Sequence, residues 1–129
     1  MAFAQKMIDI KKQLEKAGHT VYISEFAELF LGKTEKEKIV LNRKNVLENN
    51  AIREHWEKIK ESDAILVLNY ERKGIPGYVG GNTFLEIGFA YILNKTIYLL
   101  YPAPNISFYK AEIEGMTPVV LNGDLAKIH

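Results

Sequence analysis

Two short and almost uninterrupted apolar runs constrain the fold of this chain more than any other feature. Residues 64–68 read Ala-Ile-Leu-Val-Leu, and residues 95–101 carry Ile-Tyr-Leu-Leu at their centre. A strand with one face in water alternates apolar and polar residues, whereas a strand buried on both faces of a parallel sheet is apolar throughout. We therefore expect parallel strands near residues 64–69 and 96–101, joined by a helical crossover.

Three longer segments have the patterns of helices. Residues 84–93 are nearly all apolar, which predicts a helix that is buried on all sides. Residues 3–17 repeat apolar side chains at steps of three and four, and Gly18 follows as the expected C′ residue. A third helix is predicted over residues 43–60, with an apolar stripe that includes Trp56.

Shorter elements complete an alternation of helices and strands. We expect strands at residues 20–23 and 118–121, and a short helix at residues 109–114. Ser24 is a candidate cap for a helix that ends before Gly32, and residues 34–38 form a charged stretch expected to be solvated. The alternation indicates an α/β fold. Because the chain opens with a helix, either the sheet is small or a first strand with its phosphate-binding turn lies upstream of Met1.

The composition narrows the classes of function. The 129 residues include 17 Lys plus Arg and 16 Asp plus Glu, a net charge of +1, which provides no basic field to hold a nucleic acid polymer or an anionic membrane. The lack of cysteine excludes disulfides, thiolate nucleophiles and Cys-ligated metals. The apolar runs are shorter than a membrane span of ~20 residues, and no signal peptide opens the chain. We expect one cytoplasmic domain over residues 1–129.

A polar and glycine-rich segment follows the first apolar run, over residues 69–82. Ligands of open parallel sheets bind beyond the carboxyl ends of the strands, which is where this segment should lie. Its four glycines would let the backbone approach a ligand closely, and the next helix would point its N–H groups at an anion. Tyr70 and Tyr78 are candidates to face the ligand. Neither the Walker pattern nor the dinucleotide fingerprint is present.

Glu86 is the sharpest single feature, because it is the one carboxylate in the apolar helix at residues 84–93. It is a candidate catalytic residue. A structural explanation competes with this one, since Thr83-x-x-Glu86 fits a capping box, in which the Glu only closes the start of a helix. The residues alone leave both interpretations open.

His55 is the second candidate, since its spacing with Ile52, Trp56 and Ile59 turns it toward the core side of its helix. A lone histidine at such a position is more often a hydrogen-bonded core residue than a catalyst. No cluster of His, Asp and Glu has the spacing of metal ligands. We therefore expect neither a metal nor another cofactor.

Several segments together resemble a known family. The segments are residues 62–69 (Ser-Asp-Ala-Ile-Leu-Val-Leu-Asn), 80–90 (Gly-Gly-Asn-Thr-Phe-Leu-Glu-Ile-Gly-Phe-Ala) and 94–100 (Asn-Lys-Thr-Ile-Tyr-Leu-Leu). They resemble the nucleoside 2-deoxyribosyltransferase superfamily, which also contains the 2′-deoxynucleoside 5′-phosphate N-hydrolases. The tail, residues 109–116 and 122–125, is similar to a poorly characterised branch of that superfamily.

The resemblance implies a three-layer flavodoxin-like or Rossmann-like fold and cleavage of an N-glycosidic bond. Glu86 stands at the position of the family nucleophile, which attacks C1′ and forms a glycosyl-enzyme intermediate. The chain departs from the family at two acidic positions, which fall near His55 and at Gly80. The family turn before the first helix would be reduced to the residues around Met1. Family members are commonly oligomers, and the stripe with Trp56 favours a homo-oligomer here.

The leading hypothesis is N-glycosidic cleavage or deoxyribosyl transfer on a nucleoside or nucleoside monophosphate. Glu86 is the predicted nucleophile, and His55 assists at the base. The predicted substrate-binding residues are Asn69, Tyr78, Gly80, Gly81, Asn82 and Thr83. The alternative is a non-catalytic nucleotide-binding module on the same fold, which the missing acidic residues and missing first strand favour. A third possibility is an enzyme fragment that folds only within an oligomer.

Overall fold

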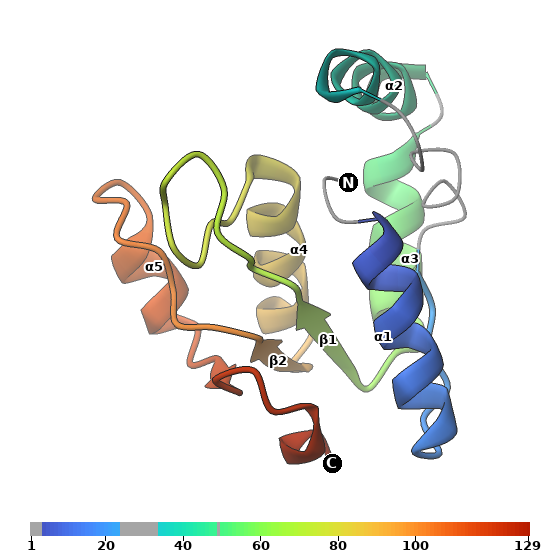
Figure 1. Cartoon of the computed structure of the whole chain (residues 1–129), viewed down its shortest axis with the longest axis vertical. Coiled ribbons are helices and arrows are strands. Elements are labelled where there is room, and N and C mark those ends of the chain that lie inside the picture. The colour runs from blue at the N-terminus through green and yellow to red at the C-terminus, as the bar shows by residue number, and fades with distance from the viewer. Residues whose placement is uncertain (1–3, 24–33, 49) are drawn as a thin grey trace. The chain divides into compact units, whose positions relative to one another are not determined.

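The structure is a computed structural model that describes residues 4–23, 34–48 and 50–129. The chain divides into two compact units, Met1–His55 and Trp56–His129. The boundary falls inside helix α3, Ala51–Glu61, so the two ends of this helix belong to different units. Figure 1 shows the elements along the chain.

The first unit contains α1, Ala4–Lys16, and α2, Glu35–Glu48, followed by the start of α3. Helix α1 ends as its sequence predicts. Gly18 has a φ of 101°, in the left-handed region that glycine tolerates. The N–H of His19 donates to the carbonyl of Leu14 at 3.0 Å, and the N–H of Gly18 donates to that of Glu15 at 3.1 Å. These two bonds form a Schellman motif, which satisfies carbonyls at the end of α1.

The predicted helix over residues 43–60 is wrong in its extent, because two helices share this segment. Helix α2 ends at Glu48 and α3 begins at Ala51. Between them Asn50 has a φ of 58°, which a continuing α-helix does not permit but which asparagine tolerates. Helix α2 also begins earlier than expected, inside the charged stretch at residues 34–38.

A capping box starts helix α2. The N–H of Glu37 donates to Oγ1 of Thr34, and the N–H of Thr34 donates to Oε1 of Glu37, each at 3.1 Å. This reciprocal pair satisfies donors that the first turn of a helix cannot bond internally. The charged stretch thus contains the start of a helix.

The predicted strand at residues 20–23 is absent, and in the described part of the chain no strand precedes residue 64. Side chains that favour strands form one only where a neighbouring strand accepts their backbone hydrogen bonds, and the described sheet does not include this segment. The helix proposed after Ser24, over residues 24–31, and the turn around Met1 lie outside the described residues.

The second unit contains a parallel three-stranded sheet, as the two apolar runs predict. Its strands are β1, Ala64–Val67, β2, Thr96–Leu99, and β3, Val119–Val120, in the order β1-β2-β3. Ala64 lies opposite Thr96 and Val67 opposite Leu99, while β3 pairs with the end of β2. The architecture is therefore α/β.

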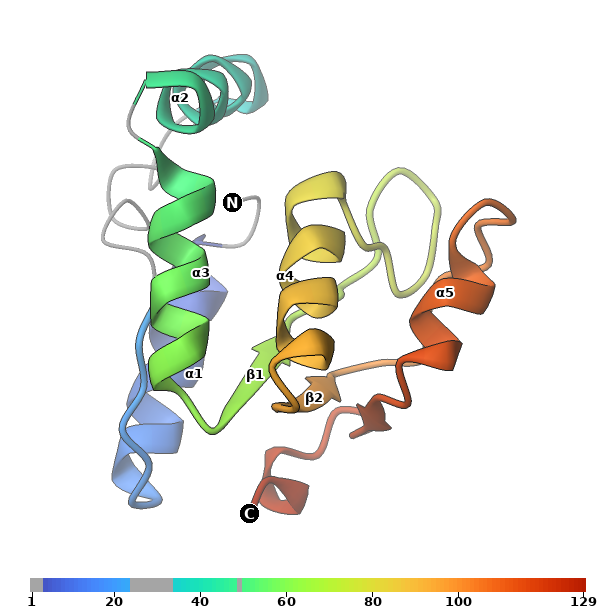
Figure 2. The same cartoon turned by 180° about the vertical axis from the view of Figure 1, so that it is seen from behind.

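Each face of the sheet has its own apolar cluster. Helices α4, Gly81–Ile92, and α5, Lys110–Gly115, pack on one face (Figure 2). Ile87 and Ile113 are completely buried there against Val67 and Leu99. On the other face Tyr98, Leu100 and Leu121 form a smaller cluster, covered in part by the 3-10 helix η2, Leu125–Lys127.

Helix α4 is not buried on all sides, which corrects the prediction from its composition. Ile87 and Ala90 face the core, but Leu85 is 43% exposed and Ile92 is 72% exposed. Only one stripe of a helix can face a sheet, and the apolar residues outside that stripe remain exposed. Trp56 packs edge-on against Phe89 of α4, with ring centroids 5.4 Å apart. Trp56, one residue of the stripe that suggested a homo-oligomer, therefore has a partner within its own unit. The oligomer stays a prediction.

No helix among the described residues is both long and apolar enough to span a membrane.

Candidate functional site

The glycine-rich segment connects the carboxyl end of β1 to the start of α4. The sequence predicts that a ligand binds at this segment. Within it, the backbones of Arg72 and Ile75 exchange hydrogen bonds of 3.3 and 2.8 Å. Lys73 and Gly74 form the turn between them, with φ values of 53° and 77°. Two successive positive φ angles are the signature of a type I′ turn. This part of the loop is thus a tight turn closed by two backbone hydrogen bonds.

Asn69 joins the ends of β1 and β2. Its Nδ2 donates to the carbonyl of Tyr101 at 2.7 Å, and its Oδ1 accepts from the N–H of Tyr101 at 2.9 Å. Longer bonds run from Nδ2 to the carbonyls of Pro102 at 3.3 Å and Gly77 at 3.4 Å. The side chain is 0% exposed. The sequence predicts that Asn69 binds substrate, and direct contact stays a prediction. The structure shows this side chain buried and bonded to backbone atoms of Gly77, Tyr101 and Pro102.

Gly77 fits closely against the segment that follows β2. Its φ is 70°, and a Cβ atom at this position would lie 2.2 Å from the carbonyl oxygen of Pro102. No side chain can occupy that space without moving the backbone. Gly77 is therefore required both by conformation and by proximity.

Tyr78 and Val79 follow Gly77 and have different partners. The guanidinium carbon of Arg72 lies 5.5 Å from the ring centroid of Tyr78, within the range of a cation–π interaction. The carbonyl of Val79 accepts a hydrogen bond from the hydroxyl of Tyr109, at the start of α5. Burial raises the pKa of Tyr109, and the charge of an ionised Tyr78 raises it further. Sequence reasoning missed Arg72 as a partner of Tyr78 and Tyr109 as a partner of the loop.

Gly80 is the N-cap of α4, and Gly81, Asn82 and Thr83 form its first turn. The N–H of Phe84 donates to the carbonyl of Gly80 at 2.9 Å, which closes that turn. The first N–H groups of a helix have no acceptor within it, and the helix dipole adds positive potential there. Four of the predicted substrate-binding residues are thus consecutive at one helix start.

Glu86 is a half-buried residue within α4. The capping-box explanation for it is wrong, because the N-cap is Gly80 and Thr83 already lies inside the helix. Glu86 follows Asn82 by four residues and Thr83 by three, so the three side chains share one side of α4. Side chains in a helix lean toward its N-terminus, which directs Glu86 back toward the glycine-rich turn.

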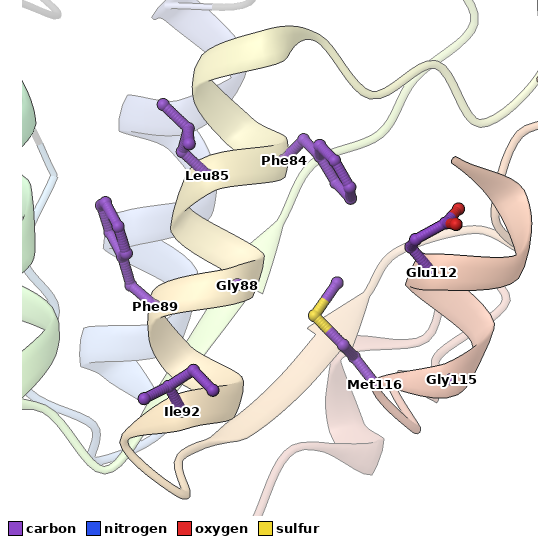
Figure 3. A pocket seen from close by; sticks show the side chains of 8 residues that line it. All are labelled: Phe84, Leu85, Gly88, Phe89, Ile92, Glu112, Gly115 and Met116. Atoms are coloured by element: carbon purple, nitrogen blue, oxygen red, sulfur yellow. The ribbon is translucent and has the colours of Figure 1, made fainter. Parts of the chain in front are cut away.

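An apolar groove of about 600 Å³ lies between α4 and α5, apart from the glycine-rich loop. Its lining comprises Phe84, Leu85, Gly88, Phe89, Ile92, Glu112, Gly115 and Met116. Figure 3 shows Phe84 and Met116 projecting into the gap from the two helices. Gly88 lies two residues after Glu86, about 200° around the helix at 3.6 residues per turn. Glu86 is not among the residues that line this groove.

His55 is the last residue of the first unit, while Glu86 belongs to the second. The proposed pairing of His55 with Glu86 at one site stays a prediction. Within the described residues, no group of three or more His, Asp or Glu side chains is placed to hold a metal ion.

Comparison with protein-family models, with curated proteins and with solved structures finds no match to this chain.

Proposed function

We propose that this chain cleaves the N-glycosidic bond of a nucleoside or nucleoside monophosphate, or transfers its deoxyribosyl group, with Glu86 as the nucleophile. One observation carries the proposal: Glu86 shares a side of α4 with Asn82 and Thr83. This helix starts at two glycines, Gly80 as its N-cap and Gly81 as its first residue. The motif resemblance to the nucleoside 2-deoxyribosyltransferase superfamily and its flavodoxin-like fold supports the same assignment, as does the parallel α/β sheet.

In the proposed reaction the carboxylate of Glu86 attacks C1′ of the sugar. The bond from C1′ to the base nitrogen breaks, the base keeps the electron pair and takes up a proton, and a glycosyl ester of Glu86 forms. Water then attacks C1′, loses a proton and releases the carboxylate; in a transfer, a second base attacks instead. The first turn of α4 holds the sugar or phosphate.

The test is a base-release screen over nucleosides and nucleoside monophosphates, repeated on Glu86→Gln. Loss of a covalent nucleophile should cost several kcal/mol of barrier, about a thousandfold or more in rate at ~1.4 kcal/mol per tenfold. Glu112→Gln is the matched control, because Glu112 lines the apolar groove between α4 and α5, which Glu86 does not line. It should retain the rate, and both variants should melt near the unaltered protein. Unchanged turnover in folded Glu86→Gln would end the nucleophile assignment.

The second candidate is a non-catalytic nucleotide-binding module. Gly80 favours it, because this N-cap glycine stands where the resembling family has an acidic residue. In that case no probe would release its base, while nucleoside monophosphates would bind equally to the unaltered protein and to Glu86→Gln. Calorimetric titration on the same protein samples separates the two candidates.

A further inference from the structure

Tyr109 is the N-cap residue of α5 and lies thirty residues after Val79 in the chain, yet it reaches the glycine-rich loop. Its ring belongs to the main apolar cluster and is 9% exposed. Its hydroxyl donates to the carbonyl of Val79, a residue that is itself 1% exposed. A buried carbonyl needs a donor, and this one receives it from the side chain of a distant helix.

The same ring makes a second contact on the other side of the glycine pair. It stacks on Phe84, with centroids 5.0 Å apart and planes inclined by 28°. Val79 precedes Gly80 and Gly81, and Phe84 follows them just after the first turn of α4. Glycine is the residue with the greatest backbone freedom. Tyr109 therefore contacts the chain on both sides of two adjacent glycines.

Asn69 restrains the loop two residues earlier, through the carbonyl of Gly77 at 3.4 Å. Tyr78 is thus the one residue between two bonded carbonyls, at Gly77 and Val79. The restraint from Tyr109 is the one adjacent to the N-cap of α4.

We propose that Tyr109 is a positioning residue for the substrate loop: its hydroxyl holds the Val79 carbonyl and so orients Tyr78 and the Gly80–Gly81 turn toward the sugar or phosphate. The inference rests on the proposed function of this loop. Binding groups held in one geometry avoid the entropic cost of ordering when the substrate arrives. Removal of the hydroxyl should therefore weaken substrate binding more than it slows the chemical step.

The test is Tyr109→Phe, which keeps the ring and its stacking on Phe84 but removes the donor. Tyr98→Phe is the matched control. Tyr98 is also a buried tyrosine, but it lies on the other face of the sheet, and its hydroxyl accepts from the N–H of His129 at 3.5 Å. Amide hydrogen exchange is measured across both variants, and KM and kcat are measured on the substrate found in the base-release screen.

We expect amide exchange over residues 78–84 to become about tenfold faster in Tyr109→Phe. Local opening of the loop must break the bond from Tyr109 to Val79 in the unaltered protein, and in the variant this bond is absent, so opening costs less free energy. Exchange there should not change in Tyr98→Phe. KM should rise about tenfold in Tyr109→Phe, with kcat changed less, since the altered loop binds substrate less well. A merely structural loss would instead reduce the amount of active protein and leave KM unchanged.

Unchanged exchange over residues 78–84 in Tyr109→Phe would overturn the inference, and so would faster exchange with an unchanged KM. If the unaltered protein releases no base from any probe, the proposed function fails on its own. The exchange measurement then still decides whether Tyr109 holds the loop, because it needs no substrate.

Discussion

Replacement of Gly77 by alanine tests the close fit of the loop against the end of β2. Gly77 has a φ of 70°, and the carbonyl oxygen of Pro102 lies only 2.2 Å from where a Cβ atom would be. Alanine therefore meets two separate obstacles, an unfavourable backbone conformation and a clash with a backbone atom. Neither can be relieved by rotation of a side chain.

The two costs can be estimated separately. A left-handed conformation costs a non-glycine residue roughly 1–2 kcal/mol. Forcing an extra carbon into a closely packed site costs typically about 1–3 kcal/mol. Gly77→Ala should therefore lower the free energy of unfolding by about 2–5 kcal/mol, a large share of the roughly 5–15 kcal/mol that keeps a domain folded.

Urea denaturation followed by circular dichroism measures this loss, with Gly74→Ala as the matched control. Gly74 has a similar φ of 77°, but nothing lies within 4 Å of its added Cβ atom. Its substitution carries only the conformational cost, about 1–2 kcal/mol. The difference between the two variants isolates the clash. Equal losses in the two variants would refute the close approach to Pro102.

Three further predictions concern α4, the buried amide and the tyrosines. Gly88→Ala should raise the free energy of unfolding by roughly 0.5–1 kcal/mol, since Gly88 lies inside α4 with open space around an added Cβ atom. Urea denaturation would detect this gain, and a lower free energy of unfolding would contradict the open space at Gly88. Asn69→Ala should lower the free energy of unfolding by about 1–3 kcal/mol or more, because the N–H of Tyr101 loses its acceptor. An unchanged urea midpoint would argue against this role of the Asn69 side chain. Burial raises the pKa of Tyr70 and Tyr109 above the ordinary 10.0. The contribution of these tyrosines to stability should therefore be full below pH 10 and fall above it, because they ionise at lower pH in the unfolded chain than in the folded one. Thermal melts from pH 8 to 11 would show the melting temperature fall, and a rise would contradict the burial of these hydroxyls.

The features that depend only on residues close together in the sequence could be predicted from it. The apolar runs at residues 64–68 and 95–101 predict buried parallel strands, because a strand with water on one face cannot be apolar throughout. Gly18 marks the end of α1, because a left-handed residue is needed there. The position of the glycine-rich loop after β1 follows from the same pattern.

Two capping patterns mark where local sequence stops being sufficient. Thr34-x-x-Glu37 and Thr83-x-x-Glu86 have the same spacing, yet only the first is a capping box. At the second, the helix starts three residues earlier, with Gly80 as its N-cap. The strand predicted at residues 20–23 fails for a similar reason, since the described sheet does not pair with it.

Only the tertiary structure decided how the loop is held. Asn69 and Tyr101 are 32 residues apart in the chain, and Val79 and Tyr109 are 30 apart. No periodicity or local motif connects residues at such separations, because their contacts depend on how α5 and the ends of β1 and β2 pack. The sequence by itself therefore determined which residues form the loop. Packing determined that the Asn69 side chain bonds the backbone of Tyr101 and that the Tyr109 hydroxyl bonds the carbonyl of Val79. The physical reason is that buried polar atoms must find partners wherever the fold brings them.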